Sequence, residues 1–177
     1  NVTVSRNYIG TNATGTVAAA NGIGINLNNN ASDSAVIGGP SITDGNVISG
    51  NTTNGITING TSAPGAAGNV VQNNYIGVNA SGTARLANAG DGINLGTFSA
   101  NTTIVGNMIG LGNDGIEIAG SDSNVIQGNY IGTNSAGTLN FGNAGDINSD
   151  GIDLTGDADL NAIGGAGTGQ ANVIANA

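Results

Sequence analysis

The stretch Asn124–Thr138, NVIQGNYIGTNSAGT, is written three times in this chain with small changes. Residues 69–83 read NVVQNNYIGVNASGT, and residues 1–16 read NVTVSRNYIGTNATGT. A peptide that recurs at intervals of a few tens of residues is the sequence signature of a repeat architecture, in which each unit stacks on the next. The chain of 177 residues is long enough for one domain built in this way.

Three short patterns recur in a fixed order along the whole chain. The first is x-x-[VI], as in Asn124-Val125-Ile126, and the second is Asn-x-Ile, as in Asn129-Tyr130-Ile131. The third is Gly-Ile-x-[IL], which begins at Gly22, Gly55, Gly92, Gly115 and Gly151. Each pattern alternates with a period of two, which predicts a strand of about three residues. The sequence therefore predicts five complete cycles of three short strands and part of a sixth.

Stacking of these cycles would place equivalent side chains in columns about 4.8 Å apart, the spacing of neighbouring strands. In the third pattern of the first cycle, we expect Ile23 and Ile25 to point inward and Gly24 to point outward. Inward Asn side chains would be costly unless their amides pair with one another and with turn backbone. One expected column is Asn7, Asn46, Asn74, Asn107, Asn129 and Asn172, and another is Ile9, Ile48, Ile76, Ile109, Ile131 and Ile174.

The pattern resembles the right-handed parallel β-helix of the pectin-lyase-like group, which carries an internal asparagine ladder. With GNYIGTNSAGT, DGIDL and NAIGG it looks like a repeat found in large secreted or surface-attached bacterial proteins. The fold class expected for residues 1–177 is therefore all-β, a single right-handed parallel β-helix of about five to six coils with three short strands each. Neither end carries a polar cap, so we expect a segment of a longer solenoid or a subunit of an axial filament.

Composition excludes several functional classes. The chain has no Cys and no His, and therefore no disulfides, no thiol chemistry and no serine triad. The net charge of −9 argues against nucleic acid as a partner. No apolar run reaches the ~18 residues of a membrane span. Residues 91–177 hold nine acidic residues and no basic residue, so the whole net charge lies in the second half.

Long loops follow the second strand in three cycles, at residues 11–21, 78–91 and 133–150. The same three cycles carry Tyr8, Tyr75 and Tyr130, where other cycles carry Val47 or Met108. The first interpretation is that each loop folds back onto its tyrosine. Alternatives are a protein contact or a ligand-binding platform on which sugars stack, since a tyrosine has an apolar face and a polar tip.

Acidic residues fall into two of the expected columns. The residue before each third-strand Gly reads Asn21, Asn54, Asp91, Asp114 and Asp150, and the outward position reads Gly24, Thr57, Asn94, Glu117 and Asp153. The plainest interpretation is turn chemistry and solvated surface. A second is a Ca²⁺ site, because clustered carboxylates suit this cation; its candidate ligands are Asp114, Asp150, Asp153, Asp157 and Asp159. A third is glycoside hydrolysis, with Asp114, Glu117, Asp150 and Asp153 as candidate catalytic residues.

The resemblance to pectate lyases implies a basic catalytic residue near bound Ca²⁺, and this chain departs from that pattern. Arg6 and Arg85 lie away from the acidic columns by cycle count, and there is no Lys. We therefore expect a non-catalytic, extracellular or cell-surface structural or adhesive module that associates end to end or continues into flanking coils. The alternative is a carbohydrate-active enzyme or polysaccharide-binding solenoid that uses the acidic columns, with a polysaccharide as partner.

Overall fold

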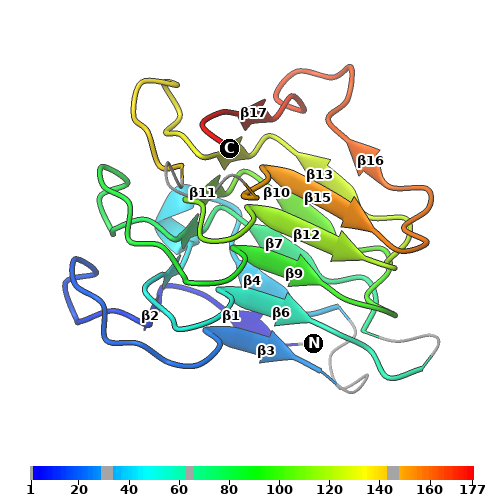
Figure 1. The fold of residues 1–177 in the computed structure, drawn as a ribbon, viewed down its shortest axis with the longest axis horizontal. Coiled ribbons are helices and arrows are strands. Elements are labelled where there is room, and N and C mark those ends of the chain that lie inside the picture. Colours follow the sequence, from blue (N-terminus) through cyan, green and yellow to red (C-terminus); the bar gives the residue numbers. More distant parts are fainter. Residues whose placement is uncertain (1, 29–33, 63–65, 143–147) are drawn as a thin grey trace.

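The computed structural model describes residues 2–28, 34–62, 66–142 and 148–177, and it is a parallel β-helix. Its strands form three parallel sheets, which wrap around one interior (Figure 1). The first sheet contains β1 (Thr3–Val4), β4 (Val36–Gly38), β7 (Val70–Gln72), β10 (Thr103–Val105), β13 (Val125–Gln127) and β16 (Ala162–Ile163). The second contains β2 (Tyr8–Ile9), β5 (Val47–Ile48), β8 (Tyr75–Ile76), β11 (Met108–Ile109), β14 (Tyr130–Ile131) and β17 (Val173–Ile174). The third contains β3 (Ile25–Leu27), β6 (Ile56–Ile58), β9 (Ile93–Leu95), β12 (Ile116–Ala119) and β15 (Ile152–Thr155).

One short helix interrupts the described strands, η1 (Ile42–Asp44), a 3₁₀ turn on the corner between β4 and β5. Like strands pair in register from one coil to the next, as in Ile104↔Ile126 and Ile109↔Ile131. The β-helix predicted from the repeat is thus confirmed, and so is its division into three strands per coil. Among the described residues, no helix has the length and hydropathy that a membrane span requires.

The asparagine column predicted from the sequence is present in all six coils. The side-chain amide of each member donates to the side-chain oxygen of the next, from Asn7 to Asn172, at 2.9–3.0 Å. The interior members also donate to strand carbonyls; Asn107, for example, donates to Val71 at 2.9 Å and to Val105 at 3.2 Å. Each buried amide therefore has its hydrogen bonds, which is the condition for placing it inside the coil.

The isoleucine column is confirmed as well. Ile48, Ile76, Ile109 and Ile131 are all fully buried, and they pack into one continuous apolar core. Each such burial contributes about 1.5–3 kcal/mol relative to an exposed side chain. The core is narrow because each strand supplies only one or two inward side chains, so neighbouring coils must remain in register to cover it.

The predicted register of the third strand in the first coil is wrong. Ile25 pairs with Ile56 and Leu27 with Ile58, so Ile25 and Leu27 point inward, and Asn26 takes the outward position assigned to Gly24. Ile23 therefore takes the place assigned to Asn21, before the glycine. A shift of two residues preserves the inward–outward alternation, so periodicity could not distinguish GIGI from GINL.

Gly24 instead begins a column of glycines. A Cβ atom there would lie 2.5 Å from the carbonyl oxygen of Gly55, and one at Gly55 would lie 2.6 Å from that of Gly92. The same contact recurs at Gly92 and Gly115 with the glycine of the next coil, at 2.6 and 2.5 Å. The backbones of successive coils approach too closely at this corner for any side chain. This close approach is why the third pattern begins with glycine.

Replacement of an interior ladder residue should be far more costly than replacement of a terminal one. Asn107→Ala leaves the backbone N–H of Asn74 and the backbone carbonyl of Val71 without the side chain that they bond inside the coil. We expect a loss of about 3 kcal/mol in the free energy of unfolding, measured by urea denaturation. Asn172→Ala, in the last coil, should cost less than about 1 kcal/mol. Equal losses of unfolding free energy in the two variants would show that burial does not determine how much a ladder asparagine contributes to stability.

Candidate functional site

The loops predicted after the second strand begin as short antiparallel hairpins. Isolated bridges join Thr11 to Ala18, Val78 to Arg85 and Thr133 to Asn140. In each hairpin one Asn side chain holds the turn. Asn134 Oδ1, for example, accepts the backbone N–H groups of Thr138 at 2.8 Å and Leu139 at 3.0 Å. The bonds repeat at Asn12 and Asn79.

Two turn residues explain the repeated letters NYIGTNxxGT. The first Gly, at positions 10, 77 and 132, has φ of +80°, +67° and +71° and turns the chain out of the second strand. The second Gly, at positions 15, 82 and 137, has φ of +65°, +63° and +68° and closes the hairpin. Both conformations favour glycine over other residues. The loop and its tyrosine therefore recur together because one sequence segment encodes both.

The first two hairpins lie against the tyrosine of their own coil. A Cβ atom on Gly15 would lie 2.7 Å from the ring of Tyr8, and one on Gly82 would lie 3.0 Å from the ring of Tyr75. Gly137 has open space at the same position, so this glycine makes no such contact with Tyr130. The interpretation that the loop folds back onto its tyrosine thus agrees with the contacts of Tyr8 and Tyr75. Tyr8 nevertheless remains 51% exposed.

The first acidic column is a hydrogen-bonded ladder of its own. The Asn54 side-chain oxygen accepts the N–H of Asp91 at 2.9 Å, and Asp91 accepts that of Asp114 at 3.4 Å. Asp114 in turn accepts the N–H of Asp150 at 2.7 Å. Asp91 and Asp114 are both only 5% exposed. Asp91 and Asp114 therefore hold adjacent coils together, and their burial departs from the solvated surface of the plainest interpretation.

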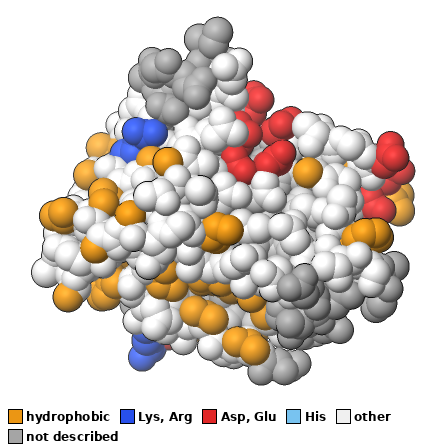
Figure 2. All heavy atoms as spheres, turned by 60° about the horizontal axis from the view of Figure 1, so that its bottom comes forward, with side chains coloured by type: hydrophobic (Ala, Val, Ile, Leu, Met, Phe, Trp, Pro, Cys, Tyr) orange, Lys and Arg blue, Asp and Glu red, His pale blue; other side chains and the backbone are white. Residues whose placement is uncertain are grey.

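Amide side chains lie between the carboxylates of the two columns. Asn113 donates to both Asp91 and Asp114 at 3.1 Å. Asn94 donates to Asp91 at 2.9 Å and makes a very short contact with Glu117. Glu117 is paired in register with Asp153 of the next coil. The acidic side chains gather on one face of the molecule, as Figure 2 shows.

Burial and the proximity of these carboxyl groups raise the pKa of both Glu117 and Asp114. Burial, the hydrogen bond with Asp91 and the charges of Asp91, Asp114 and Asp153 raise the pKa of Glu117 to about 7. Burial also raises the pKa of Asp114, and the neighbouring carboxylates act in the same direction. Glu117 is therefore protonated in a substantial fraction of molecules at neutral pH.

The structure brings four of the candidate acids together, Asp114, Glu117, Asp150 and Asp153, as the columns predict. Asp157 and Asp159 lie beyond β15, and Asp159 donates its backbone N–H to Asp122 rather than to this cluster. Within the described ranges, no group of three or more acidic side chains has a geometry that could hold a metal ion. The Ca²⁺ hypothesis therefore gains no support from the placement of these residues.

Both arginines are engaged elsewhere. Arg6, between β1 and β2, forms an ion pair with Asp44 at 2.5 Å. The guanidinium of Arg85 donates to the carbonyl of Leu111 at 2.8 and 2.6 Å. Neither of these interactions involves a member of the acidic cluster, as the cycle count predicted for the two residues.

Sequence reasoning missed a second asparagine ladder. The Asn21 amide donates to Asn51 at 3.2 Å, and that of Asn51 donates to Asn88 at 2.8 Å. Asn51 and Asn88 are buried at the corner that leads into the third strand. An Asn three residues before Asn54 and another three residues before Asp91 were a signal for this ladder. The signal is weak because Asn21 and Asn88 follow a hairpin, whereas Asn51 follows the second strand directly.

In comparisons with known proteins, no family model, curated sequence or solved structure matches this chain significantly. The assignment to a class therefore rests on the architecture itself, a parallel β-helix with internal asparagine ladders.

The raised pKa of Glu117 predicts a pH-dependent stability. An acid whose pKa is raised from 4.5 to about 7 on folding binds more protons when folded. The free energy of unfolding therefore falls as the pH rises through this interval, and the full penalty is present above it. We expect a lower melting temperature at pH 8 than at pH 5.5, measured by circular dichroism.

The Glu117→Gln variant removes this titration. Its melting temperature should exceed that of the unmodified chain at pH 8 and should change less between the two pH values. Asp157→Asn, which removes an exposed carboxylate outside the cluster, is the matched control and should show the same change in melting temperature between the two pH values as the unmodified chain. If Glu117→Gln also shows that same change, Glu117 is not the group that makes the stability depend on pH.

Proposed function

We propose that this chain is a non-catalytic structural and adhesive β-helix module of a secreted or surface-attached protein. The observation that supports this role is the asparagine ladder, which runs through all six coils from Asn7 to Asn172 without a break. Together with three in-register parallel sheets, it fixes each coil to the next along ~29 Å at the usual strand spacing. Such a rigid rod is suited to holding a binding surface at a fixed distance.

Inward-facing side chains of the last strands are exposed, and this exposure favours association along the solenoid axis. Ile163 and Ile174 are 44% and 47% exposed, although Ile126 and Ile131, their partners in the preceding coil, are fully buried. Leu154 is 42% exposed above fully buried Ile118. A further coil of the same kind would cover these side chains and pair with the open strand edges. We propose that further coils stack there, either along the same chain or from a second copy.

Self-association of the isolated chain tests this proposal. We expect the sedimentation coefficient to rise with protein concentration. The double variant Ile163→Lys/Ile174→Lys should remain monomeric, because two charges cannot be buried against an apolar coil. Phe98→Lys, at an exposed apolar side chain between β9 and β10 in the middle of the solenoid, is the control and should associate like the unmodified chain. A chain that is monomeric at all concentrations would contradict stacking between copies.

A polysaccharide-cleaving enzyme is the second candidate, and Glu117 is the observation that favours it. Glu117, with a pKa of about 7, lies beside Asp153, and glycoside hydrolysis requires a pair of carboxyl groups of this kind. Against it, the Asp114 carboxylate is 5% exposed and already accepts two hydrogen bonds. An acid tied to its neighbours in this way contributes to coil stacking and has little access to a substrate.

Sugar release separates the two candidates. We expect no increase in reducing ends or unsaturated products when the chain is incubated with acidic and neutral polysaccharides, with or without Ca²⁺. Release that disappears in both Glu117→Gln and Asp114→Asn would place a hydrolytic site on the acidic cluster and overturn the non-catalytic proposal. Release that persists in both variants would point to a contaminating activity, and a separately purified preparation would then show none.

A further inference from the structure

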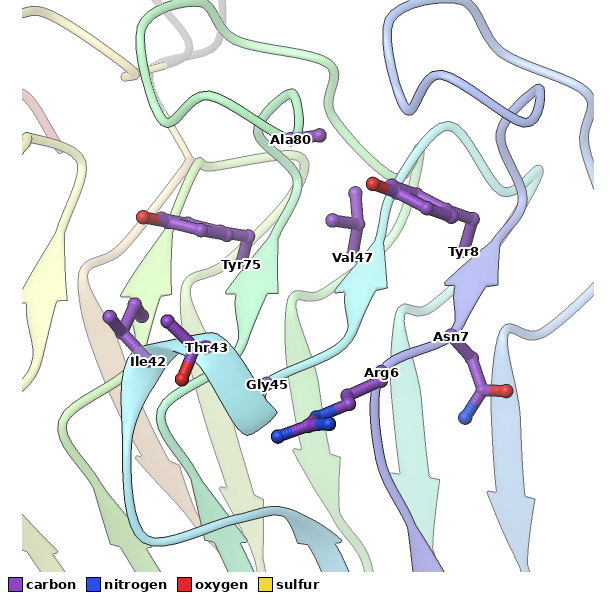
Figure 3. A pocket seen from close by; sticks show the side chains of 9 residues that line it. All are labelled: Arg6, Asn7, Tyr8, Ile42, Thr43, Gly45, Val47, Tyr75 and Ala80. Carbon is purple, nitrogen blue, oxygen red and sulfur yellow. The ribbon is translucent and has the colours of Figure 1, made fainter.

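Two grooves of the same design follow each other on the outer face of the second sheet. The first is lined by Tyr8, Val47, Tyr75 and Ala80, and Figure 3 shows these side chains. The second is lined by Tyr75, Met108, Tyr130 and Ser135. Each has a volume of about 420 Å³.

The two grooves are related by the repeat itself. Val47, Tyr75, Met108 and Tyr130 occupy one position of successive coils, because β5, β8, β11 and β14 pair in register. Each groove therefore has a tyrosine at either end and an aliphatic floor between them, and Tyr75 belongs to both. The tyrosines lie two coils apart, which is ~9.6 Å at the usual strand spacing. A site that repeats by translation suits a ligand that also repeats, which is a polymer.

The tyrosine rings form one aromatic wall. In Figure 3 the rings of Tyr8 and Tyr75 are seen edge-on with a similar tilt, and their hydroxyls point the same way, across the strands. Gly15 and Gly82 support these two rings from the hairpin side. Across the groove, Ile42 of η1 lines both sites and is 43% exposed. The groove thus presents ring faces on one side and a mainly apolar ridge on the other.

Polar groups in the grooves are neutral or already paired. In the described part of the chain, no hydrogen bond engages the hydroxyls of the three tyrosines, so these groups can bond to a ligand. Arg6 in the first groove forms an ion pair with Asp44, and no charged residue lines the second groove. With a net charge of −9, the chain repels polyanions. Charge therefore favours an uncharged ligand that carries many hydroxyl groups.

We propose that the tyrosine grooves bind an extended, uncharged polysaccharide, with alternate sugar rings stacked on Tyr8, Tyr75 and Tyr130. In an extended β-1,4-linked glycan the sugar rings lie in a flat ribbon, and its disaccharide repeat is close to the rise of two coils. Each tyrosine then meets the same face of every second sugar. This inference rests on the adhesive role proposed above and adds the chemical class of the ligand.

A proline-rich peptide is the other polymer with a matching repeat. A polyproline II helix advances about 9.3 Å in each three-residue turn. Such a helix is a rounded rod that inserts its prolines into clefts between aromatic rings. Parallel rings that form a single wall favour the flat ribbon of a glycan, and the peptide is therefore an alternative outcome of the test.

Calorimetric titration of the full chain with cellohexaose, cellotriose and a proline-rich dodecapeptide tests the proposal. We expect cellohexaose to bind more tightly than cellotriose, because only the longer ligand spans both grooves. Tyr75→Ala should weaken cellohexaose binding about tenfold, since it removes the ring that both grooves share. Tyr8→Ala and Tyr130→Ala should each lose less, and Tyr75→Phe should retain most of the affinity.

Matched controls separate ring stacking from a loss of fold. Phe98→Ala removes an exposed aromatic side chain that lines neither groove, and it should leave binding unchanged. Circular dichroism must show the same melting temperature for Tyr75→Phe and the unmodified chain.

Absence of oligosaccharide binding, equal binding by Tyr75→Ala, or preferential binding of the peptide would each overturn the proposal. Self-association through the solenoid ends is measured separately, so the structural role would survive these results.

Discussion

The buried asparagine amide is the constraint on which this structure depends. An amide inside a coil needs partners for both its N–H groups and its oxygen, and a single coil cannot provide them. The next coil can, provided that an asparagine occupies the same position one strand spacing away. Asn46 illustrates this: it donates to Asn74, accepts from Asn7 and also bonds to the carbonyl of Val4. The register of the coils and the repeated peptide both follow from this requirement.

The same stacking brings carboxylates together where aspartate replaces asparagine. Asp91 and Asp114 perform the ladder's accepting role, but they cannot donate, and each brings a charge. Asn94 and Asn113 supply donors between them, and Glu117 takes up a proton near neutral pH. The acidic face is therefore the electrostatic consequence of a structural ladder. Its carboxylates resemble a catalytic set because the solenoid places them one coil apart.

The proposed ligand site depends on residues that differ between coils. Coils with a hairpin place a tyrosine on the outer face of the second sheet, whereas Val47 and Met108 occupy this position in the coils between them. The alternation converts a uniform sheet into a groove with a period of two coils. In the role that we propose, the rod binds a polymer along its side while its ends associate with further coils.

The sequence by itself determined the β-helix, its asparagine and isoleucine columns and the placement of Glu117 beside Asp153, because short-range repetition is visible in one dimension. Only the tertiary structure decided that Ile25 stacks on Ile56, since GIGI and GINL differ by two residues and preserve the same alternation. It also decided that Asn21 joins Asn51, and that two tyrosine grooves share Ile42. The physical reason is that some coils carry a hairpin after the second strand and others do not, so these residues stand at unequal intervals along the chain, and only stacking of the coils brings them side by side.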